Sequence, residues 1–460
     1  MPKGLRTLAF SFDDVGLTHF SGLVLLQRFC QQLRLRWLLQ RDVLPPQGAG
    51  DFQPADLLLA LIYVLIAGLK RVSKTPILQY DGAFLSILGM ERFPDPSSLR
   101  RLLQRLSPHT IRQLVRLHDR LRAGLGEIPR PRSTLWFDLD AVVLTLYGRQ
   151  QGARLGYNPK KKGRRSYHPL LCFESHGQEF WHGSLRPGNT SANTGVIGFL
   201  QRCAAKLPGH LARTRVRVRA DCGFFGGKLL GFLEENRWSY VIVAKQYSTL
   251  RQRALNARFK KLGGGWEAGE FFYQPYGWPR KRRFVVVRRP VPEDPEEAAQ
   301  LQLLTHRQYA YSVLVTNLKL SPWRTWLCYV GRARVEKTIR ELLYDLPLSQ
   351  IPTAQWLANV AFFQTLMLAY NLVHWFKRLC LPKSYCTATV ETVRRRFLAV
   401  PGRLVNRGPT RAALAARLPL AKGTAGRGAS DPKIAPAQKN LNLSVNLLIA
   451  SNVDRLFYAS

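Results

Sequence analysis

Acidic residues are scarce in this sequence of 460 residues, and the scarcity limits the partners that suit it. Asp and Glu number 29 against 69 Lys and Arg, which gives a formal net charge of +40. A charge of this size attracts polyanions over long distances and argues against specialisation for acidic small molecules. We therefore expect nucleic acid as the partner. An anionic membrane surface or a generally basic protein background is the alternative.

Paired cysteines and long apolar runs are also missing. The seven cysteines are odd in number and include no C-x-x-C pair, so neither a disulfide framework nor a zinc knuckle is indicated. The most apolar stretch, residues 57–69, is shorter than the roughly 20 residues that cross a bilayer. Asp13 and Asp14 interrupt the N-terminal apolar run before a signal-peptide core forms. We expect a protein of the reducing cytoplasm with no membrane segment.

The hydrophobic pattern changes along the chain and predicts several domains. Residues 18–125 carry apolar residues at helical spacing. From residue 135 the runs alternate as in strands, with a helical stretch at 194–207, which fits a mixed α/β sheet. Residues 248–325 contain glycine turns between aromatic and β-branched runs, typical of a β-rich insertion. Helices return after it, and we expect the long apolar helix at 353–379 to pack on the sheet.

The same pattern predicts where these domains begin and end. The predicted ranges are 1–128 for an all-helical domain, 129–247 and 326–382 for two parts of a sheet-containing core, 248–325 for the insertion, 383–430 for a loosely ordered basic tail and 431–460 for an unassigned C-terminus. Within the helical domain, residues 96–105 predict a helix bearing Arg100, Arg101 and Arg105. That helix either lies along DNA or presents a solvated basic face.

Three segments carry acidic residues in positions suited to chemistry. Asp138 and Asp140 lie in the apolar strand LWFDLDAVVLTLY and point to the same face, because strand side chains alternate. Buried, they need water, cations or a metal at that face, although a half-exposed strand explains them equally well. Asp221 follows the apolar run RVRVRA and precedes Cys222 and Gly223, where it marks either a site at a strand end or an ordinary turn.

The third acidic segment is a pattern of three- and four-residue steps. Tyr329, Arg332 and Glu336 are spaced to share one helical face, and Arg340 extends that face by another turn. A surface ladder of ion pairs has the same spacing. The segment alone therefore leaves a catalytic and a structural interpretation open.

Basic and aromatic residues surround these acids in the sequence. The segment GYNPKKKGRRSYHPL includes five basic residues without an acid, and these are Lys160, Lys161, Lys162, Arg164 and Arg165. Such density predicts contacts with DNA phosphates, with a solvated hairpin as the alternative. In the insertion, Trp266 and Trp278 suit either stacking on an unpaired base or packing inside a turn.

Taken together, these motifs resemble the DDE transposases of bacterial insertion sequences, and most of all the insertion sequence 1380 family. The resemblance covers roughly residues 15–420, and GYNPKKKGRRSYHPL is its most specific segment. It implies a ribonuclease-H-like catalytic core, a β-rich insertion between the second Asp and the Glu, and a helical DNA-binding region before the core. Two positions depart from the family pattern, namely Val142 in place of a hydroxyl residue and Leu343 in place of a Lys.

Carried over by motif, the resemblance places the catalytic acids at Asp140, Asp221 and Glu336. Three carboxylates are hard oxygen ligands suited to Mg²⁺ or Mn²⁺, and two such ions about 4 Å apart support in-line phosphodiester displacement. By the core architecture, Asp140 bridges both ions, Asp221 binds one and Glu336 the other. The basic segment, Tyr329, Arg332 and Arg340 are the expected DNA contacts.

The resemblance also implies partners and a location. The implied partner is double-stranded DNA, both the terminal inverted repeats of the element and the target. The resemblance also implies a homodimer on paired ends and no membrane. The implied location is the bacterial cytoplasm, at the nucleoid. Two alternatives stay open. One is a ribonuclease-H-like nuclease that cuts without joining, and the other is a DNA-binding remnant that has lost catalysis, consistent with Val142 and Leu343.

Overall fold

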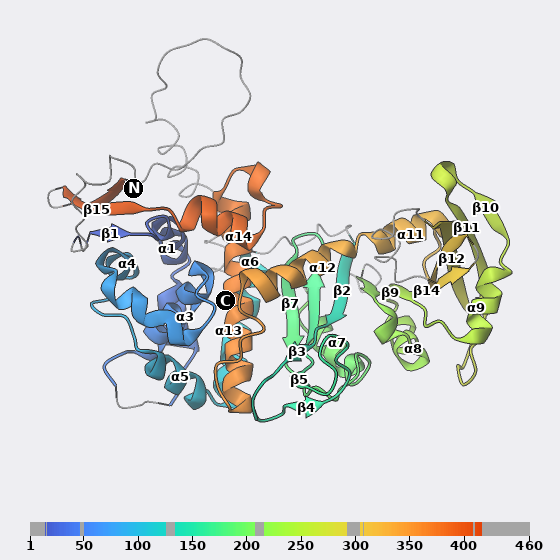
Figure 1. Cartoon of the computed structure of the whole chain (residues 1–460), viewed down its shortest axis with the longest axis horizontal. Coiled ribbons are helices and arrows are strands. Elements are labelled where there is room, and N and C mark those ends of the chain that lie inside the picture. Colours follow the sequence, from blue (N-terminus) through green and yellow to red (C-terminus); the bar gives the residue numbers. More distant parts are fainter. Residues whose placement is uncertain are drawn as a thin grey trace, which may run out of the picture. The chain divides into compact units, whose positions relative to one another are not determined.

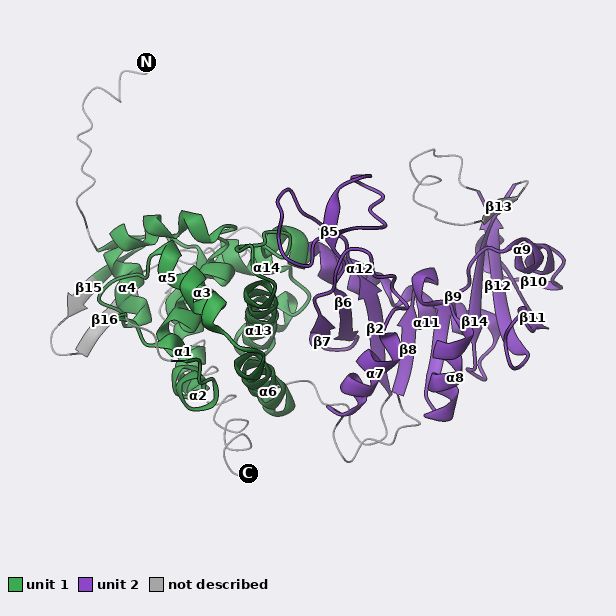
Figure 2. Ribbon diagram, turned by 90° about the horizontal axis from the view of Figure 1, so that it is seen from below, with its two compact units in different colours: residues 1–125, 341–460 green, residues 126–340 purple. Residues whose placement is uncertain are grey.

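The computed structural model describes residues 14, 16–46, 50–125, 134–207, 216–291, 304–306, 308–407 and 410–415. The chain forms two compact units, one of residues 1–125 with 341–460 and the other of residues 126–340 (Figure 2). The first consists mainly of helices, and the second contains a large mixed sheet (Figure 1). The predicted C-terminal tail lies outside the described residues from residue 416 onward.

The helical unit is built around one buried helix. Its α-helices are α1 Leu23–Gln32, α2 Leu35–Asp42, α3 Pro54–Ala67, α4 Gly82–Leu88, α5 Pro96–Arg105, α6 Pro108–Leu125, α13 Trp356–Cys380 and α14 Val390–Val393. Its 3-10 helices are η2 Val72–Tyr80 and η7 Lys383–Tyr385, and its π-helical segments are η6 Glu341–Asp345 and η8 Arg394–Leu398. Helix α13 packs against α3, α5 and α6, so the expectation that the sheet buries this helix is corrected.

The apolar length of α13 explains its central place. It is long and apolar enough by composition to span a bilayer, yet 83% of its most apolar window is buried in the structure, as in the core helix of a globular unit. Helix α3 contains most of the apolar stretch at residues 57–69. It is also a core helix, with every residue from Leu57 to Ala67 buried. The sequence placed residues 341–382 with the sheet, whereas they cluster with the N-terminal helices.

Two further predictions about the helical unit need correction. Its N-terminal part is not all-helical, because β1 Leu17–Thr18 pairs with β15 Gly402–Arg407, which in turn pairs with β16 Thr410–Ala415. The predicted basic tail is ordered over residues 383–407. Arg394 is buried there and donates hydrogen bonds to the carbonyl oxygens of Ile66, at 2.8 Å, and Asp345, at 2.7 Å. Arg394 thus provides hydrogen bonds to backbone carbonyl groups at the ends of α3 and η6 instead of remaining in solvent.

The second unit is organised by a single mixed sheet. Its strand order is β10-β11-β12-β14-β9-β8-β2-β6-β7, with β13 beside β14. The strands are β2 Leu135–Ala141, β6 Leu170–Glu174, β7 Glu179–Ser184, β8 Val216–Ala220, β9 Ser239–Val243, β10 Phe259–Lys261, β11 Glu267–Tyr273, β12 Arg282–Pro290, β13 Leu304–His306 and β14 Tyr309–Thr316. Strand β2 is antiparallel to β6 and parallel to β8, and β8 is parallel to β9.

Helices cover both faces of this sheet. The remaining elements of the unit are α7 Val196–Ala204, α8 Gly227–Glu235, α9 Ser248–Leu255, α11 Pro322–Val330, α12 Ala333–Arg340 and the short turns η4 Cys222–Phe224 and η5 Gly263–Gly265. Residues of α7, α8 and α9 share one core with β2, β8 and β9, whereas Trp323 and Trp326 of α11 pack on the opposite core. A small separate sheet, β3 Leu144–Thr145, β5 Arg165–Tyr167 and β4 Arg154–Leu155, follows β2.

The predicted insertion is β-rich and extends the main sheet. Strand β14 pairs antiparallel with β9, so residues after 248 continue outward from the predicted core. Two aromatics considered for base stacking are packing residues here. Trp266 lies 5.5 Å from Trp323 between ring centres, and Trp278 lies 5.0 Å from Phe225.

Candidate active site

Strand β2 sends its acids to the face of the sheet that α11 covers. Phe137 and Leu139 belong to the core shared with α7 and α8, whereas Trp136 packs with α11. Because strand side chains alternate, Asp138 and Asp140 lie on the same side as Trp136. The sequence interpretation of these two acids as sharing one face agrees with this packing.

Asp138 is neutralised inside the protein. Arg219 of β8 donates from Nε and Nη2 to the two carboxylate oxygens at 2.6 and 2.7 Å. Arg219 also donates to the Cys328 carbonyl on α11 at 2.8 Å and to the hydroxyl of Ser175. Burial raises the pKa of Asp138, and Arg219 opposes that rise. This bidentate pair ties β2, β8 and α11 together, which leaves Asp138 no free oxygen for a ligand.

Asp140 lies two residues further along the same strand and is also engaged at both oxygens. It is 9% exposed. Its Oδ1 accepts from the Ala141 amide at 2.7 Å, and its Oδ2 accepts from Arg332 Nη2 at 2.6 Å. Burial raises the pKa of Asp140 to about 6; Arg332 opposes the rise, and the charges of Asp221 and Glu336 add to it. The charges of the other two predicted catalytic acids therefore both reach Asp140.

The parallel ladder of β2 and β8 ends at the pair Asp138 and Arg219, two residues before Asp140 and Asp221. Leu135 of β2 pairs with Val216 of β8, an offset of 81 residues that continues through the ladder. The same offset separates Asp140 from Asp221. Asp221 follows the last residue of β8, where its Oδ1 accepts from the Gly223 amide at 2.8 Å and caps the short helix η4.

The third acid stands at the start of α12. Glu336 is largely exposed, with 68% of its side chain accessible, and its Oε1 lies 3.4 Å from Arg332 Nη1. The expected single helical face is interrupted, because α11 ends at Val330 and α12 begins at Ala333. Tyr329 is thus on α11, Arg332 in the turn between the helices, and Glu336 on α12. Burial is the main cause that raises the pKa of Tyr329 to about 12. The nearby acids add to the rise, and the charge of Arg332 opposes it.

Arg332 is the cation at the centre of this arrangement. It is 4% exposed and contacts Asp140, the Leu139 carbonyl at 3.3 Å and Glu336. Although burial disfavours its charge, Asp140 and the neighbouring groups raise the pKa of Arg332 above its ordinary value. The guanidinium therefore stays charged, and it offsets part of the negative charge that the three acids concentrate at this edge.

The acids meet the chemical requirement for a hard divalent cation without forming a closed cage. Within the described part of the chain, no three Asp, Glu, His or Cys side chains come together closely enough to hold a metal ion. The donors available are carboxylate oxygens, which suit Mg²⁺ and Mn²⁺. Burial first, and then the charges of Asp221 and Glu336, raise the pKa of Asp140, so added positive charge would stabilise the site. Carboxylate oxygens suit the cation chemically. Arg332 is hydrogen-bonded to one of the two oxygens of Asp140.

The predicted basic segment forms an ordered, exposed hairpin. Asn158 is buried, donates to the Thr145 hydroxyl at 3.0 Å and accepts from the Lys161 amide at 3.1 Å. Lys160, Lys161, Lys162, Arg164 and Arg165 are all exposed. The hairpin belongs to the small sheet of β3, β4 and β5, which comes after β2, the strand that bears Asp140. Arg340 is exposed at the end of α12.

Sequence reasoning missed the buried residues that hold the acids in place. In the sequence Arg219 is one residue of an alternating strand, and its partner Asp138 lies 81 residues away. His168 is buried near Asp221; its Nδ1 lies 2.6 Å from the Thr190 carbonyl, and its own carbonyl accepts from Arg186 at 3.0 Å. Burial lowers the pKa of His168, and the Asp221 charge opposes this. For Arg219, the signal that could have found it was the unusual placement of an arginine inside an apolar strand.

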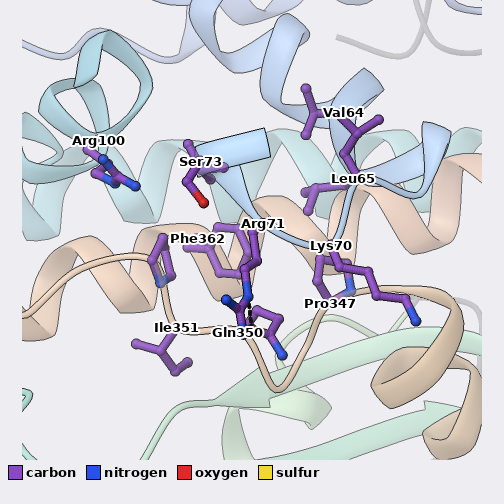
Figure 3. Close-up of a pocket in the computed structure, with 13 residues that line it drawn as sticks. Val64, Leu65, Lys70, Arg71, Ser73, Arg100, Pro347, Gln350, Ile351 and Phe362 are labelled. Atoms are coloured by element: carbon purple, nitrogen blue, oxygen red, sulfur yellow. Dashed lines mark hydrogen bonds between the residues drawn. The ribbon is translucent and has the colours of Figure 1, made fainter. Parts of the chain in front are cut away.

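The helical unit carries a separate basic pocket of about 260 Å³. Lys70, Arg71, Ser73, Arg100 and Gln350 line it, and no acidic residue does. Figure 3 shows Arg71 directed at Gln350, to which it donates at 3.2 Å. The predicted basic helix is α5, and of its three arginines only Arg100 lines this pocket.

Comparison with known proteins adds a family match. The family described as Transposase DDE domain group 1 matches residues 2–424. Among solved structures, a piggyBac transposase synaptic complex with hairpin DNA is similar with a TM-score of 0.42 and 13% identity, over 83% of this chain and 81% of that chain. A Drosophila P element transposase strand transfer complex has a TM-score of 0.24 and 10% identity, over 51% of each chain.

A third solved structure, a pre-cleavage Mos1 transpososome, has a TM-score of 0.17 and 11% identity, over 48% of this chain and 77% of that chain. No curated protein matches the chain.

Proposed function

The chain belongs to the family described as Transposase DDE domain group 1, and we propose that it binds the ends of its mobile element, cleaves phosphodiester bonds and joins the freed 3′ hydroxyl to target DNA. One observation carries the proposal. Asp140 and Glu336 share the guanidinium of Arg332, and Asp221 follows the last residue of β8, the parallel neighbour of the strand that bears Asp140. A site of this composition in a chain of net charge +40 suits a polyanionic substrate.

The strand order supports a ribonuclease-H-like core as the finer fold assignment. Strands β2, β6 and β7 form an antiparallel meander, and β8 and β9 add in parallel on the other side of β2. Helices α7 and α8 precede β8 and β9. In this proposal the first acid, Asp140, lies on β2 between β6 and β8, and the second, Asp221, follows the end of β8.

Asp140, Asp221 and Glu336 are the residues that would hold Mg²⁺ or Mn²⁺. When bound, such ions activate the attacking water and stabilise the leaving 3′ oxygen. The protein's own side chains orient the acids. Arg219 fixes the strands through Asp138, and the Gly223 amide holds one oxygen of Asp221. The exposed basic hairpin at 160–165 and Arg340 bind DNA phosphates beside the acids.

The helical unit supplies further DNA contacts in this proposal. The pocket lined by Lys70, Arg71 and Arg100 lacks acidic residues, which suits a backbone phosphate. The finer parts of the proposal are an origin in a bacterial insertion sequence of the 1380 family, a homodimer on paired ends and a place at the nucleoid. They rest on the sequence resemblance alone.

A strand-transfer assay tests the proposed function. The protein is incubated with Mg²⁺, a labelled duplex carrying the terminal repeat and a target plasmid, and the joined product is measured. A transposase gives joined product, and a nuclease of the same fold gives cleaved duplex only. A catalytically silent DNA-binding remnant gives neither, although it still retards the duplex in a gel.

A further inference from the structure

The guanidinium of Arg332 lies where positive charge is needed in the carboxylate site. Its Nη2 donates to Asp140 Oδ2 at 2.6 Å, and its Nη1 approaches Glu336 Oε1 at 3.4 Å. The other oxygen of Asp140 accepts from the Ala141 amide. Both oxygens of Asp140 are therefore engaged before any metal binds, and the one held by a side chain is the one that can be released.

The guanidinium is also incompletely bonded. Arg332 is 4% exposed, and its Nε is buried with no hydrogen-bond partner among the described residues. An unsatisfied buried donor destabilises the state that contains it. Arg219, the other arginine of the site, contrasts with it, because Arg219 binds Asp138 through two nitrogens and bonds a backbone carbonyl through the third. Arg332 is therefore the less firmly held of the two.

We propose that Arg332 is a built-in counter-ion of the metal-free site, and that divalent cations compete with it for Asp140. The inference rests on the proposed function. Without a cation, the charges of Asp221 and Glu336 would act on the buried carboxylate of Asp140 with nothing to offset them. Arg332 holds the acids together until metal replaces it at Asp140. The displaced guanidinium, still beside Glu336, then becomes a donor for a DNA phosphate, which reconciles its burial with the predicted role in DNA binding.

The competition is testable without DNA and without catalysis. Binding of Mn²⁺ to the full chain is measured by calorimetry for the natural protein, Arg332→Gln, Arg332→Lys and the control Arg334→Gln. Arg334 is exposed on α12, two residues after Arg332, so its replacement removes the same charge away from Asp140. We expect Arg332→Gln to bind Mn²⁺ about tenfold more tightly, Arg332→Lys to lie between it and the natural protein, and Arg334→Gln to match the natural protein.

Thermal melting in EDTA supplies a second readout. Arg332→Gln should melt below the natural protein, because the acids lose their counter-ion, and should gain more from added Mn²⁺. Mn²⁺ affinity equal to or weaker than that of the natural protein in folded Arg332→Gln overturns the inference. If that variant does not fold, the same criterion applies to Arg332→Lys.

An Asp221→Asn variant separates this inference from the proposed function. If Asp221→Asn leaves Mn²⁺ binding unchanged, the metal assignment fails, and the role of Arg332 fails with it. If Asp221→Asn weakens Mn²⁺ binding but Arg332→Gln does not strengthen it, the metal site stands and only the competition is wrong.

Discussion

Gly331 lies so close to Arg219 that a β-carbon added to it would come within 2.4 Å of the arginine's Nη1. That nitrogen donates to the Cys328 carbonyl, one turn earlier on α11. The contact brings the turn between α11 and α12 directly against the ion pair that anchors Asp138. The position of Glu336 relative to Asp140 therefore depends on the absence of a side chain at residue 331.

We predict that Gly331→Ala lowers both stability and DNA cleavage. The methyl group would displace Arg219 from Cys328, with an expected loss of about 1–3 kcal/mol of unfolding free energy. Cleavage should fall by about tenfold or more, because an error of about 1 Å in active-site geometry has large effects on rate. Gly198→Ala is the matched control, since the nearest atom to its β-carbon is 3.7 Å away. Equal cleavage by both variants would contradict the positioning role of this contact.

Stability of the metal-free protein should fall as pH rises through about 6 because of Asp140. The folded-state pKa of this carboxyl is raised from 3.8 to about 6, first by burial. A raised carboxyl pKa means that folding favours the protonated form, so the stabilisation is full below the unfolded pKa and is lost above the folded one. Two pKa units correspond to at most about 3 kcal/mol.

Urea unfolding in EDTA at about pH 5 and about pH 7.5 measures this effect. The unfolding free energy of the natural protein should decrease more between these pH values than that of Asp140→Asn, which has no proton to lose. Identical pH dependence in the two proteins would show that Asp140 has an ordinary pKa in the folded state.

The basic hairpin should contribute a salt-sensitive part of DNA affinity. Replacing Lys160, Lys161 and Lys162 by Ala should weaken binding of the terminal-repeat duplex. It should also reduce the slope of log affinity against log salt concentration by about 0.9 for each phosphate that these lysines neutralise. Lys260 and Lys261, exposed on the edge strand β10, provide the comparison for a general reduction in positive charge. A slope that changes equally per lysine in both variants would assign the effect to net charge alone.

The pocket of the helical unit should behave in the same way. We expect Arg71→Ala with Arg100→Ala to lower DNA affinity and to reduce the salt slope by about 0.9 for each of one or two phosphates bound there. Arg36→Ala is the control, because Arg36 is already paired with Asp56 at 2.6 Å. Fluorescence anisotropy at several salt concentrations gives the slopes. Unchanged affinity in the double variant would remove the pocket from the DNA-binding surface.

The sequence predicted what depends on short-range periodicity. The alternation in LWFDLDA placed Asp138 and Asp140 on one face, and apolar residues at helical spacing predicted helices within residues 18–125. The charges of Asp221 and Glu336 both reach Asp140. Asp140 and Asp221 are 81 residues apart, which is also the offset between paired residues of β2 and β8. This relation is visible only once the pairing of β2 with β8 is known.

The remainder depends on tertiary contacts that a local pattern does not contain. The apolar face of α13 is equally suited to a sheet or to other helices, and only the fold decides that α3, α5 and α6 bury it. The pattern through Tyr329, Arg332 and Glu336 has continuous helical spacing, yet the chain turns at Gly331, where Arg219 approaches from β8. The ion pairs of Arg219 with Asp138 and of Arg332 with Asp140 were likewise not predicted, because the two partners of each pair lie far apart in sequence.

Metal-dependent cleavage by acid variants tests the central claim most directly. The natural protein, Asp140→Asn, Asp221→Asn, Glu336→Gln and the control Glu235→Gln on α8 are assayed with Mg²⁺ on terminal-repeat duplex, and binding of the duplex is measured in parallel. The account predicts that each of the first three variants loses cleavage by about a thousandfold or more while keeping DNA affinity, as expected for groups acting on the transition state. The control should cleave normally. Cleavage by Asp221→Asn at the natural rate would contradict the account.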